Sequence, residues 1–367
     1  MNIQNIIHIC YFSPSYPGNF IASLSKLAEV SQKKYSLFFL FPTQAKNAEW
    51  LSMLPVTSDH IFFCDFSPKA LYSCCKRLSN MLGRNSTIAH THFIDYLHLL
   101  AIKRCFKNNV CHYHMAAPES NTWKRKIRKV ICNIIYKNSV IIGVSEPVTE
   151  KLRVYFRNID CECITNAIDF ERLSTYTGQE VYLSKRDADE FYLLIHGSDF
   201  IRKGVDLAIQ AVDNINKKQG IKCSLIITAH PTQTAEMFVR NYTDNSSNIK
   251  VVDVIKNIKD LYDEVDAFIS PSRSEAFAYA VAESSFCGCQ VIASNVPGQN
   301  TMKDIPGIIW VEPNSVQNIE EAILLAIDRR KSNKLSNIKK SQKLYVQENY
   351  GIDLWVKKNI DVYSKYF

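Results

Sequence analysis

The sequence predicts an α/β protein made of two doubly wound, Rossmann-like units with parallel sheets. Short β-branched and aromatic runs alternate with helix-like segments along the whole chain, which is typical of strands joined by crossover helices. The length of 367 residues suits two domains, and 46% hydrophobic residues can fill two cores. Residues 171–189 form a polar segment, which we interpret as the linker.

The predicted strands follow in order along each domain. In the first domain, residues 1–170, they are 6–12, 36–41, 61–66, 87–92, 110–114, 140–144 and 161–165. In the second domain, residues 190–349, they are 191–196, 223–229, 249–255, 267–270, 290–293 and 308–311. We expect a ligand-binding cleft between the domains. The amphipathic segment 350–367 is expected to form a helix that packs back on the first domain.

The composition indicates a cytoplasmic protein. No run approaches 18 apolar residues, and the N-terminus begins as a strand and not as a secretion signal. The twelve cysteines fall mostly inside apolar runs, which favours buried, reduced thiols over disulfides.

The surplus positive charge lies in the first half of the chain. Residues 1–165 hold 20 of the 44 basic residues but only 10 of the 36 acidic ones. From Thr122 onward, apolar residues recur at helical spacing beside a basic face of Lys124, Arg125, Lys126, Arg128 and Lys129. This helix is either an ordinary amphipathic helix with a solvated basic face or a helix that binds an anionic membrane surface at the cytoplasmic side. Nucleic acid is not an expected partner.

The most informative stretch is residues 266–298, a strand, turn, helix and second strand with two carboxylates. Glu275 falls in the turn and Glu283 on the helix. Open α/β sheets bind ligands at the carboxyl ends of their strands, next to helix N-termini. The two carboxylates are therefore expected to flank one crevice; the alternative is a surface helix with two solvated glutamates.

A cationic turn begins the second domain. Gly197 and Ser198 follow a strand, and Arg202 and Lys203 precede a predicted helix. Two cations beside a helix N-terminus form an anion site. Together with the Glu275/Glu283 helix, the turn predicts a site for a nucleotide diphosphate.

The residues of the cationic turn and of the Glu275/Glu283 helix are accompanied by Gly204, Pro271–Ser272, Gly288, Val291 and Gly298. Together they resemble the retaining GT-B glycosyltransferases of family 4 (glycosyl transferases group 1), bacterial surface-glycan type. The first half continues the resemblance. FSPSYPG ends on Gly18, HTHF and CHYHM carry paired histidines, and ITNAIDFERL carries Asn166.

The resemblance implies a GT-B fold and transfer of a hexose-type sugar from a UDP-, GDP- or ADP-linked donor to a glycan or lipid-linked acceptor, in lipopolysaccharide, O-antigen or capsule synthesis. It implies front-face attack without a protein nucleophile. Because the cationic turn already supplies the positive charge that a metal would bring, we expect no metal and no other cofactor. The diphosphate would be held by Lys203 and Arg202 and by the N–H groups of Phe277, Ala278 and Tyr279. Glu275 and His114 would face the sugar, and Glu283 would face the ribose. The donor site would be completed by Gly18, Gly197, Ser198 and Asn166.

The chain departs from the family pattern at several positions. Ser198 stands where the family usually has arginine, Ala276 and Ala278 replace glycines around Phe277, and Gln290 replaces a common proline. Two other functions therefore stay open: a sugar-nucleotide epimerase of the same shape, and a non-catalytic partner subunit.

Two possible metal motifs are discounted. Asp187-Ala188-Asp189 resembles a metal-binding DxD but falls in the linker. His90, His92 and His112 have no Asp, Glu or Cys at matching offsets, so we expect no zinc cluster. His8 and His196 are expected to be packed within strands.

Overall fold

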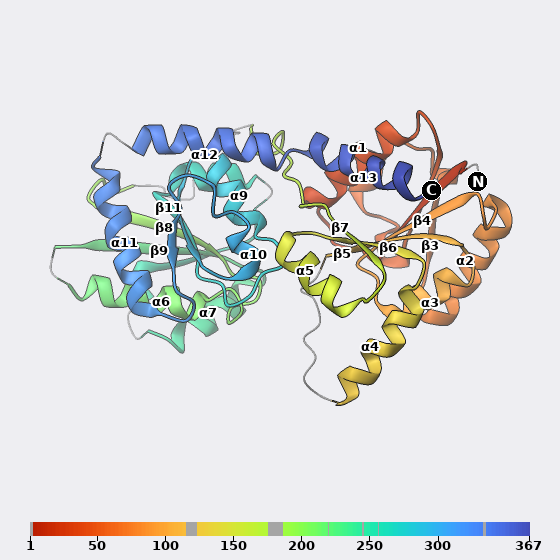
Figure 1. The fold of residues 1–367 in the computed structure, drawn as a ribbon. Coiled ribbons are helices and arrows are strands. Elements are labelled where there is room, and N and C mark those ends of the chain that lie inside the picture. Colours follow the sequence, from red (N-terminus) through yellow and green to blue (C-terminus); the bar gives the residue numbers. More distant parts are fainter. Residues whose placement is uncertain are drawn as a thin grey trace. The chain divides into compact units, whose positions relative to one another are not determined.

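The computed structural model describes residues 3–114, 123–174, 186–218, 220–243, 246–255, 257–332 and 335–367. The chain folds into two compact units, shown in Figure 1. Unit 1 comprises Met1–Asp169 and Ile352–Phe367, and unit 2 comprises Phe170–Gly351.

Unit 1 is a seven-stranded parallel sheet of order β3-β2-β1-β4-β5-β6-β7. Its strands are β1 (Asn5–Cys10), β2 (Ser36–Pro42), β3 (Ile61–Cys64), β4 (Thr87–His92), β5 (Asn108–Tyr113), β6 (Ser139–Gly143) and β7 (Asp160–Cys163). Its helices are α1 (Gly18–Ser31), α2 (Pro68–Leu82), α3 (Tyr96–Lys103), α4 (Trp123–Tyr136), α5 (Glu146–Tyr155) and α13 (Ile352–Tyr366), with short 3-10 turns η1 (Thr43–Ala45), η2 (Glu49–Met53) and η3 (Ser58–His60).

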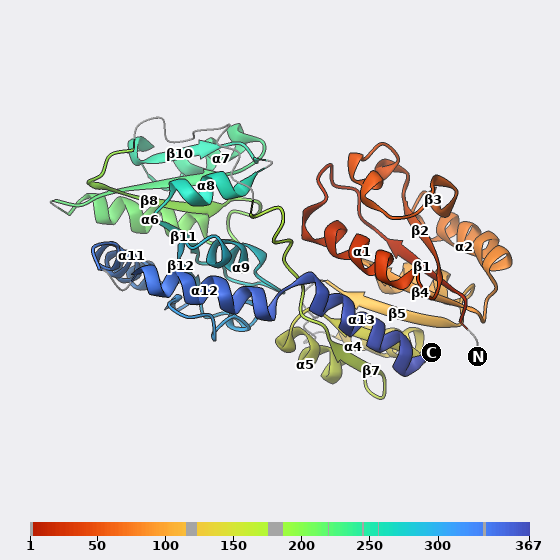
Figure 2. The same ribbon diagram turned by 90° about the horizontal axis from the view of Figure 1, so that it is seen from above.

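The C-terminal helix α13 belongs to the core of unit 1. It packs beside α1, as Figure 2 shows, although the two helices stand at opposite ends of the sequence. Trp355 and Tyr363 of α13 join Ile6 of β1, Leu24 of α1 and Val110 of β5 in one buried cluster. The predicted packing of the C-terminal helix on the first domain is confirmed.

Unit 2 is a six-stranded parallel sheet of order β10-β9-β8-β11-β12-β13. Its strands are β8 (Glu190–His196), β9 (Lys222–Thr228), β10 (Ile249–Val252), β11 (Ala267–Ser270), β12 (Gln290–Ser294) and β13 (Ile309–Val311). Its helices are α6 (Val205–Asn216), α7 (Thr232–Arg240), α8 (Ile258–Glu264), α9 (Tyr279–Phe286), α10 (Pro297–Asn300), α11 (Val316–Arg330) and α12 (Leu335–Asn349), with the 3-10 turn η4 (Ser246–Asn248).

The core of unit 2 lies between the sheet and the helices α6 and α11. Ala208 and Val212 of α6 and Ile323 of α11 pack against Leu193 and Ile269 of the central strands. On each sheet the strand order reverses beside the first strand of the unit, between β1 and β4 and between β8 and β11. Such switch points open a crevice at the carboxyl ends of the strands, and the candidate site residues follow these ends.

The fold class predicted from sequence is confirmed: each predicted strand is present and both sheets are doubly wound. All twelve cysteines are free thiols, none of them joined in a disulfide. Within the described part of the chain, every helix is too short or too polar to cross a lipid bilayer.

Candidate functional site

Two glycines shape the loop between β8 and α6. A Cβ on Gly197 would lie 2.9 Å from the Phe200 ring. Gly204 has φ +71°, and a Cβ there would lie 2.1 Å from the Pro271 carbonyl oxygen. Only glycine fits such a left-handed, close-packed position. The loop carrying Arg202 and Lys203 is therefore held directly against the loop that follows β11.

Lys203, Arg202 and Glu275 meet in one cluster. Lys203 Nζ donates to Glu275 Oε1 at 2.6 Å, and Arg202 Nη1 lies 3.3 Å from Glu275 Oε2. Ser272 Oγ donates to Glu275 Oε1 at 3.0 Å, and Arg202 Nε donates to Asp199 Oδ2 at 3.0 Å. Each cation thus has a carboxylate partner, which an incoming anion has to replace.

The Glu275 loop is anchored by a second ion pair. Arg273 donates from both terminal nitrogens to the two carboxylate oxygens of Asp206, each at 2.8 Å. These hydrogen bonds raise the pKa of the Arg273 guanidinium. Because Asp206 lies in the first turn of α6, this fork fixes the position of Glu275 relative to Lys203.

The loop before α9 has the expected form. Glu275 lies in the loop and Glu283 on the helix, which begins at Tyr279. Within the described residues, the N–H groups of Phe277 and Ala278 have no hydrogen-bond partner, whereas Tyr279 N–H donates to Phe277 O at 3.2 Å. Two of the three N–H groups that are predicted to hold the diphosphate are therefore available to donate a hydrogen bond.

Glu283 is engaged by a residue that the sequence did not indicate. Its side chain is mostly buried and forms an ion pair with Arg172. Phe170 stacks on Phe286 one turn further along α9, with ring centroids 4.6 Å apart. The first residues of unit 2 are thereby attached to α9.

Ser198 and His196 flank Gly197. Ser198 is exposed. His196 uses both ring nitrogens, with Nδ1 2.7 Å from Thr228 Oγ1 and Nε2 3.0 Å from Tyr262 Oη. Burial lowers the pKa of His196 to about 3, so it is a neutral, packed residue.

The unit 1 candidates lie at the carboxyl edge of the first sheet. Gly18 starts α1 with φ +54°, and His114 follows β5. His114 stacks on Phe93 at 4.1 Å, and Phe20 contacts both rings. Burial lowers the pKa of His114 to about 3, so this imidazole is neutral near pH 7.

Asn166 is buried in unit 1, and its N–H donates to Val144 O at 3.3 Å. Near the Gly18 turn, a cavity of about 500 Å³ opens at the same sheet edge. Its lining is aromatic and polar: Tyr11, Phe12, Ser13, Pro14, Gln44 and Phe93.

Helix α4 exposes most of its apolar face and buries Ile135. Ile127, Val130, Ile131 and Ile134 are between 42 and 70% exposed, whereas an ordinary amphipathic helix buries that face. Lys126 and Arg128 are also exposed, and Lys129 Nζ donates to Val154 O at 3.0 Å. The side chains of Lys124 and Arg125 lie outside the described residues.

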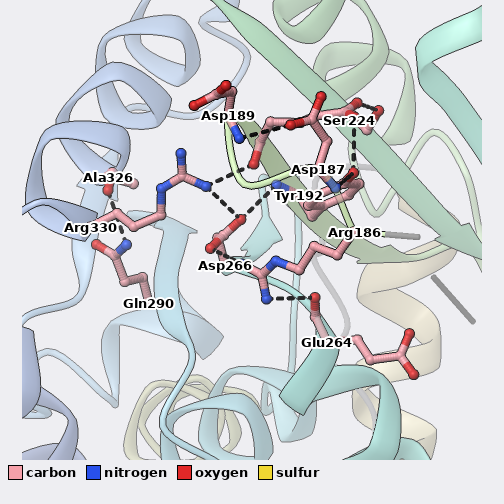
Figure 3. A network of polar contacts seen from close by, with 11 residues as sticks. Arg186, Asp187, Asp189, Tyr192, Ser224, Glu264, Asp266, Gln290, Ala326 and Arg330 are labelled. Atoms are coloured by element: carbon pink, nitrogen blue, oxygen red, sulfur yellow. Dashed lines mark hydrogen bonds and ion pairs between the residues drawn. The ribbon is translucent and has the colours of Figure 1, made fainter. Parts of the chain in front are cut away.

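Asp187 and Asp189 take part in a polar network at the opposite edge of the unit 2 sheet. Figure 3 shows Asp266, which precedes β11, between Arg186 and Arg330. Asp266 Oδ2 accepts the Tyr192 N–H at 2.9 Å, and Asp187 accepts the Asp189 N–H at 3.0 Å. The DxD-like motif therefore caps the start of β8, whereas Glu275 follows the end of β11.

Comparison with known proteins gives a family match within the second unit. The family model for glycosyl transferases group 1 matches residues 183–343, which include Lys203, Glu275 and Glu283. Among curated proteins, none matches the sequence.

Solved structures match over nearly the full chain. A glycosyltransferase from Rickettsia africae has a TM-score of 0.78 at 17% identity, covering 100% of this chain and 99% of that one. Sucrose-phosphate synthase from Thermosynechococcus elongatus has a TM-score of 0.76 at 17% identity, and the match covers 99% of this chain and 98% of that one. Anabaena HepE in complex with UDP has a TM-score of 0.75 at 14% identity, and the match covers 99% of this chain and 100% of that one. The chain thus has the GT-B fold, and the match of its second unit supports a group 1 glycosyltransferase.

The sequence missed several residues that position the site. Asp206 could have been noted as an acidic residue in a first helical turn. Arg273 and Arg172 gave no local signal, because their partners lie 67 and 111 residues away in the sequence.

Proposed function

We propose that this protein is a retaining glycosyltransferase that transfers a hexose-type sugar from a nucleotide-diphosphate donor to a glycan or lipid-linked acceptor. The Lys203–Arg202–Glu275 cluster carries the proposal. It lies within the segment that matches group 1 glycosyltransferases, at the sheet edge where such folds bind ligands.

The donor diphosphate exchanges places with Glu275 as the partner of the two cations. Lys203 and Arg202 then face phosphate oxygens, and the Phe277 and Ala278 N–H groups add neutral donors. Stabilising the charge that develops on the leaving phosphate is usually the largest catalytic contribution. Glu275, released from the cations, is left to accept hydrogen bonds from sugar hydroxyls.

Glu283 is proposed to bind the ribose hydroxyls. Arg172 already orients this carboxylate and offsets its charge, so ribose binding leaves no buried charge unpaired. HepE was solved with UDP-glucose, which favours a UDP-sugar as the first donor to try.

The resemblance supports front-face attack, in which a phosphate oxygen takes the acceptor's proton. The cations of the cluster supply the positive charge that a metal would otherwise bring, so the reaction is proposed to be metal-independent. In unit 1, His114 Nε2 is 3.2 Å from His92 Nδ1, which leaves its Nδ1 for a sugar hydroxyl. Gly18 and Asn166 are proposed to complete the donor site.

Two features of unit 1 support the proposed acceptor class. The aromatic cavity beside Gly18 suits a sugar ring, because Tyr11, Phe12 and Phe93 offer stacking faces. The exposed Ile and basic residues of α4 suit an anionic membrane surface. Together they favour a lipid-linked acceptor of surface-polysaccharide synthesis at the cytoplasmic face.

Incubation with UDP-, GDP- and ADP-sugars tests the proposal. Slow hydrolysis or transfer with retained anomeric configuration is expected, and Lys203→Ala and Glu275→Gln should each lower the rate by about 100- to 1,000-fold. Lys218→Ala is the matched control, because Lys218 is an exposed partner of Glu320 on the same unit.

Other results would point elsewhere. Inversion at C2 of the sugar would indicate an epimerase. Absence of both binding and turnover would indicate a non-catalytic partner subunit. Wild-type rates in purified Lys203→Ala or Glu275→Gln would contradict the assigned site.

A further inference from the structure

Five histidines gather on one face of the unit 1 sheet: His8 of β1, His90 and His92 of β4, His112 of β5, and His114 directly after it. His8 is the register partner of His90, and His92 that of His112. Since alternate residues of a strand face the same side, all five side chains point toward the layer formed by α1 and α13.

Three of these imidazoles are enclosed, and two of them have an unpartnered ring nitrogen. His8, His90 and His92 have no exposed surface. The Nε2 atoms of His8 and His90 have no hydrogen-bond partner among the described residues. A buried polar atom without a partner costs about 1–3 kcal/mol, which points to a ligand for His90 Nε2.

The spacing of the ring nitrogens fits a tetrahedral metal ion. One coordinating nitrogen from each of His8, His90 and His92 can be chosen so that all three lie within 4.8 Å of one another. His8 Nδ1 and His92 Nε2 are 3.4 Å apart. Zinc–nitrogen bonds of about 2.0–2.1 Å in a tetrahedron put neighbouring ligands about 3.3–3.4 Å apart.

The outer nitrogens of two of the rings are already engaged. His90 Nδ1 lies 2.6 Å from Tyr363 Oη of α13, and His92 Nδ1 lies 3.2 Å from His114 Nε2. Metal-binding histidines usually donate their second N–H to such a partner, which fixes the tautomer. In both rings this leaves Nε2 as the coordinating atom.

We propose that His8, His90 and His92 bind one zinc-class divalent ion in the core of unit 1. Neutral imidazoles suit zinc and its neighbours among the transition metals. The ion then links β1, β4 and, through Tyr363, α13.

The full-length protein, produced with zinc in the medium and dialysed against metal-free buffer, should retain about one zinc ion per chain by elemental analysis. His8→Asn and His90→Asn should lose it. His230→Asn should keep it, because His230 is exposed and pairs with Asp253 outside the cluster.

A second measurement on the wild-type chain does not depend on folding of the variants. Cobalt(II) in place of zinc should give the intense absorption of a tetrahedral site. Wild-type protein with no more zinc than His8→Asn, or cobalt with only weak octahedral absorption, would overturn the proposal. Loss of zinc in His112→Asn with retention in His8→Asn would assign the ion to His92, His112 and His114 and overturn this ligand set.

Discussion

Gly298 shows how a residue without a side chain fixes a candidate catalytic group. A Cβ on Gly298 would lie 2.1 Å from the carbonyl oxygen of Glu275 and 2.4 Å from its carbonyl carbon. Real Cβ atoms do not approach a backbone so closely, so the Glu275 loop has to move if any side chain is added. The sequence analysis noted Gly298 as part of a family pattern, and the close approach of the Glu275 backbone is a steric reason for a glycine at this position.

Gly298→Ala is therefore expected to lower transfer strongly and to cost about 1–3 kcal/mol in the free energy of unfolding, the range for overpacking. Gly351→Ala is the control, because its Cβ would meet no atom closer than 3.3 Å. Denaturant unfolding and donor turnover measure both variants. Full activity in Gly298→Ala would show that the Glu275 loop tolerates displacement.

At the scale of elements, α4 differs from the other surface helices in what it exposes. Ile127, Val130, Ile131 and Ile134 are exposed beside Lys126 and Arg128. The sequence left two interpretations of this helix open. The four exposed apolar residues support the proposal of membrane docking, and the burial of Ile135 is what an ordinary amphipathic helix also shows.

Co-sedimentation with anionic vesicles tests α4. Binding should fall as salt rises, because charges are screened beyond about 10 Å at 0.1 M salt, and both Ile131→Ser/Ile134→Ser and Lys126→Glu/Arg128→Glu should weaken it. Leu325→Ser changes a similarly exposed aliphatic residue on α11 and should have no effect. Equal binding to uncharged vesicles would argue against docking through the basic residues.

Helix α13 is part of the buried core of unit 1. Trp355 is buried against the sheet and stacks on His112 with centroids 5.7 Å apart. Trp355→Ala is expected to cost about 3–5 kcal/mol of unfolding free energy. The exposed neighbour Lys357→Ala should stay within about 0.5 kcal/mol. Urea denaturation distinguishes the two, and equal effects would contradict the core position of α13.

At the scale of the whole molecule, buried neutral histidines link stability to pH in both units. Burial lowers the pKa of His8, His114 and His196 to about 3, from an ordinary value of 6.5. Between these values the unfolded chain binds more protons than the folded one. Stability is therefore complete above pH 6.5 and declines on acidification toward pH 3.

Each such histidine contributes a slope of up to about 1.4 kcal/mol per pH unit in that window. We expect His196→Gln to flatten the decline, and His230→Asn, which changes an exposed ring, to leave it as in the wild type. Unfolding free energies at pH 7, 6 and 5 measure this. A stability that does not change over this range would mean that these histidines are protonated in the folded state.

Strand and helix positions followed from sequence because a parallel strand, buried on both faces, gives a continuous apolar run, and a helix gives 3.6-residue periodicity. The loop position of Glu275 and the cationic turn at Lys203 followed from the same local patterns. The roles of these residues toward a donor stay predictions.

Contacts between distant segments could not be read from local patterns. The sequence determined two doubly wound units and where each loop begins. Only the tertiary structure decided that Glu275 joins Lys203 and Arg202, that Arg172 engages Glu283, and that the DxD-like motif lies at the other sheet edge. It also brought His8 beside His90 and His92, because strand order and register in a parallel sheet are set by packing between segments far apart in the chain.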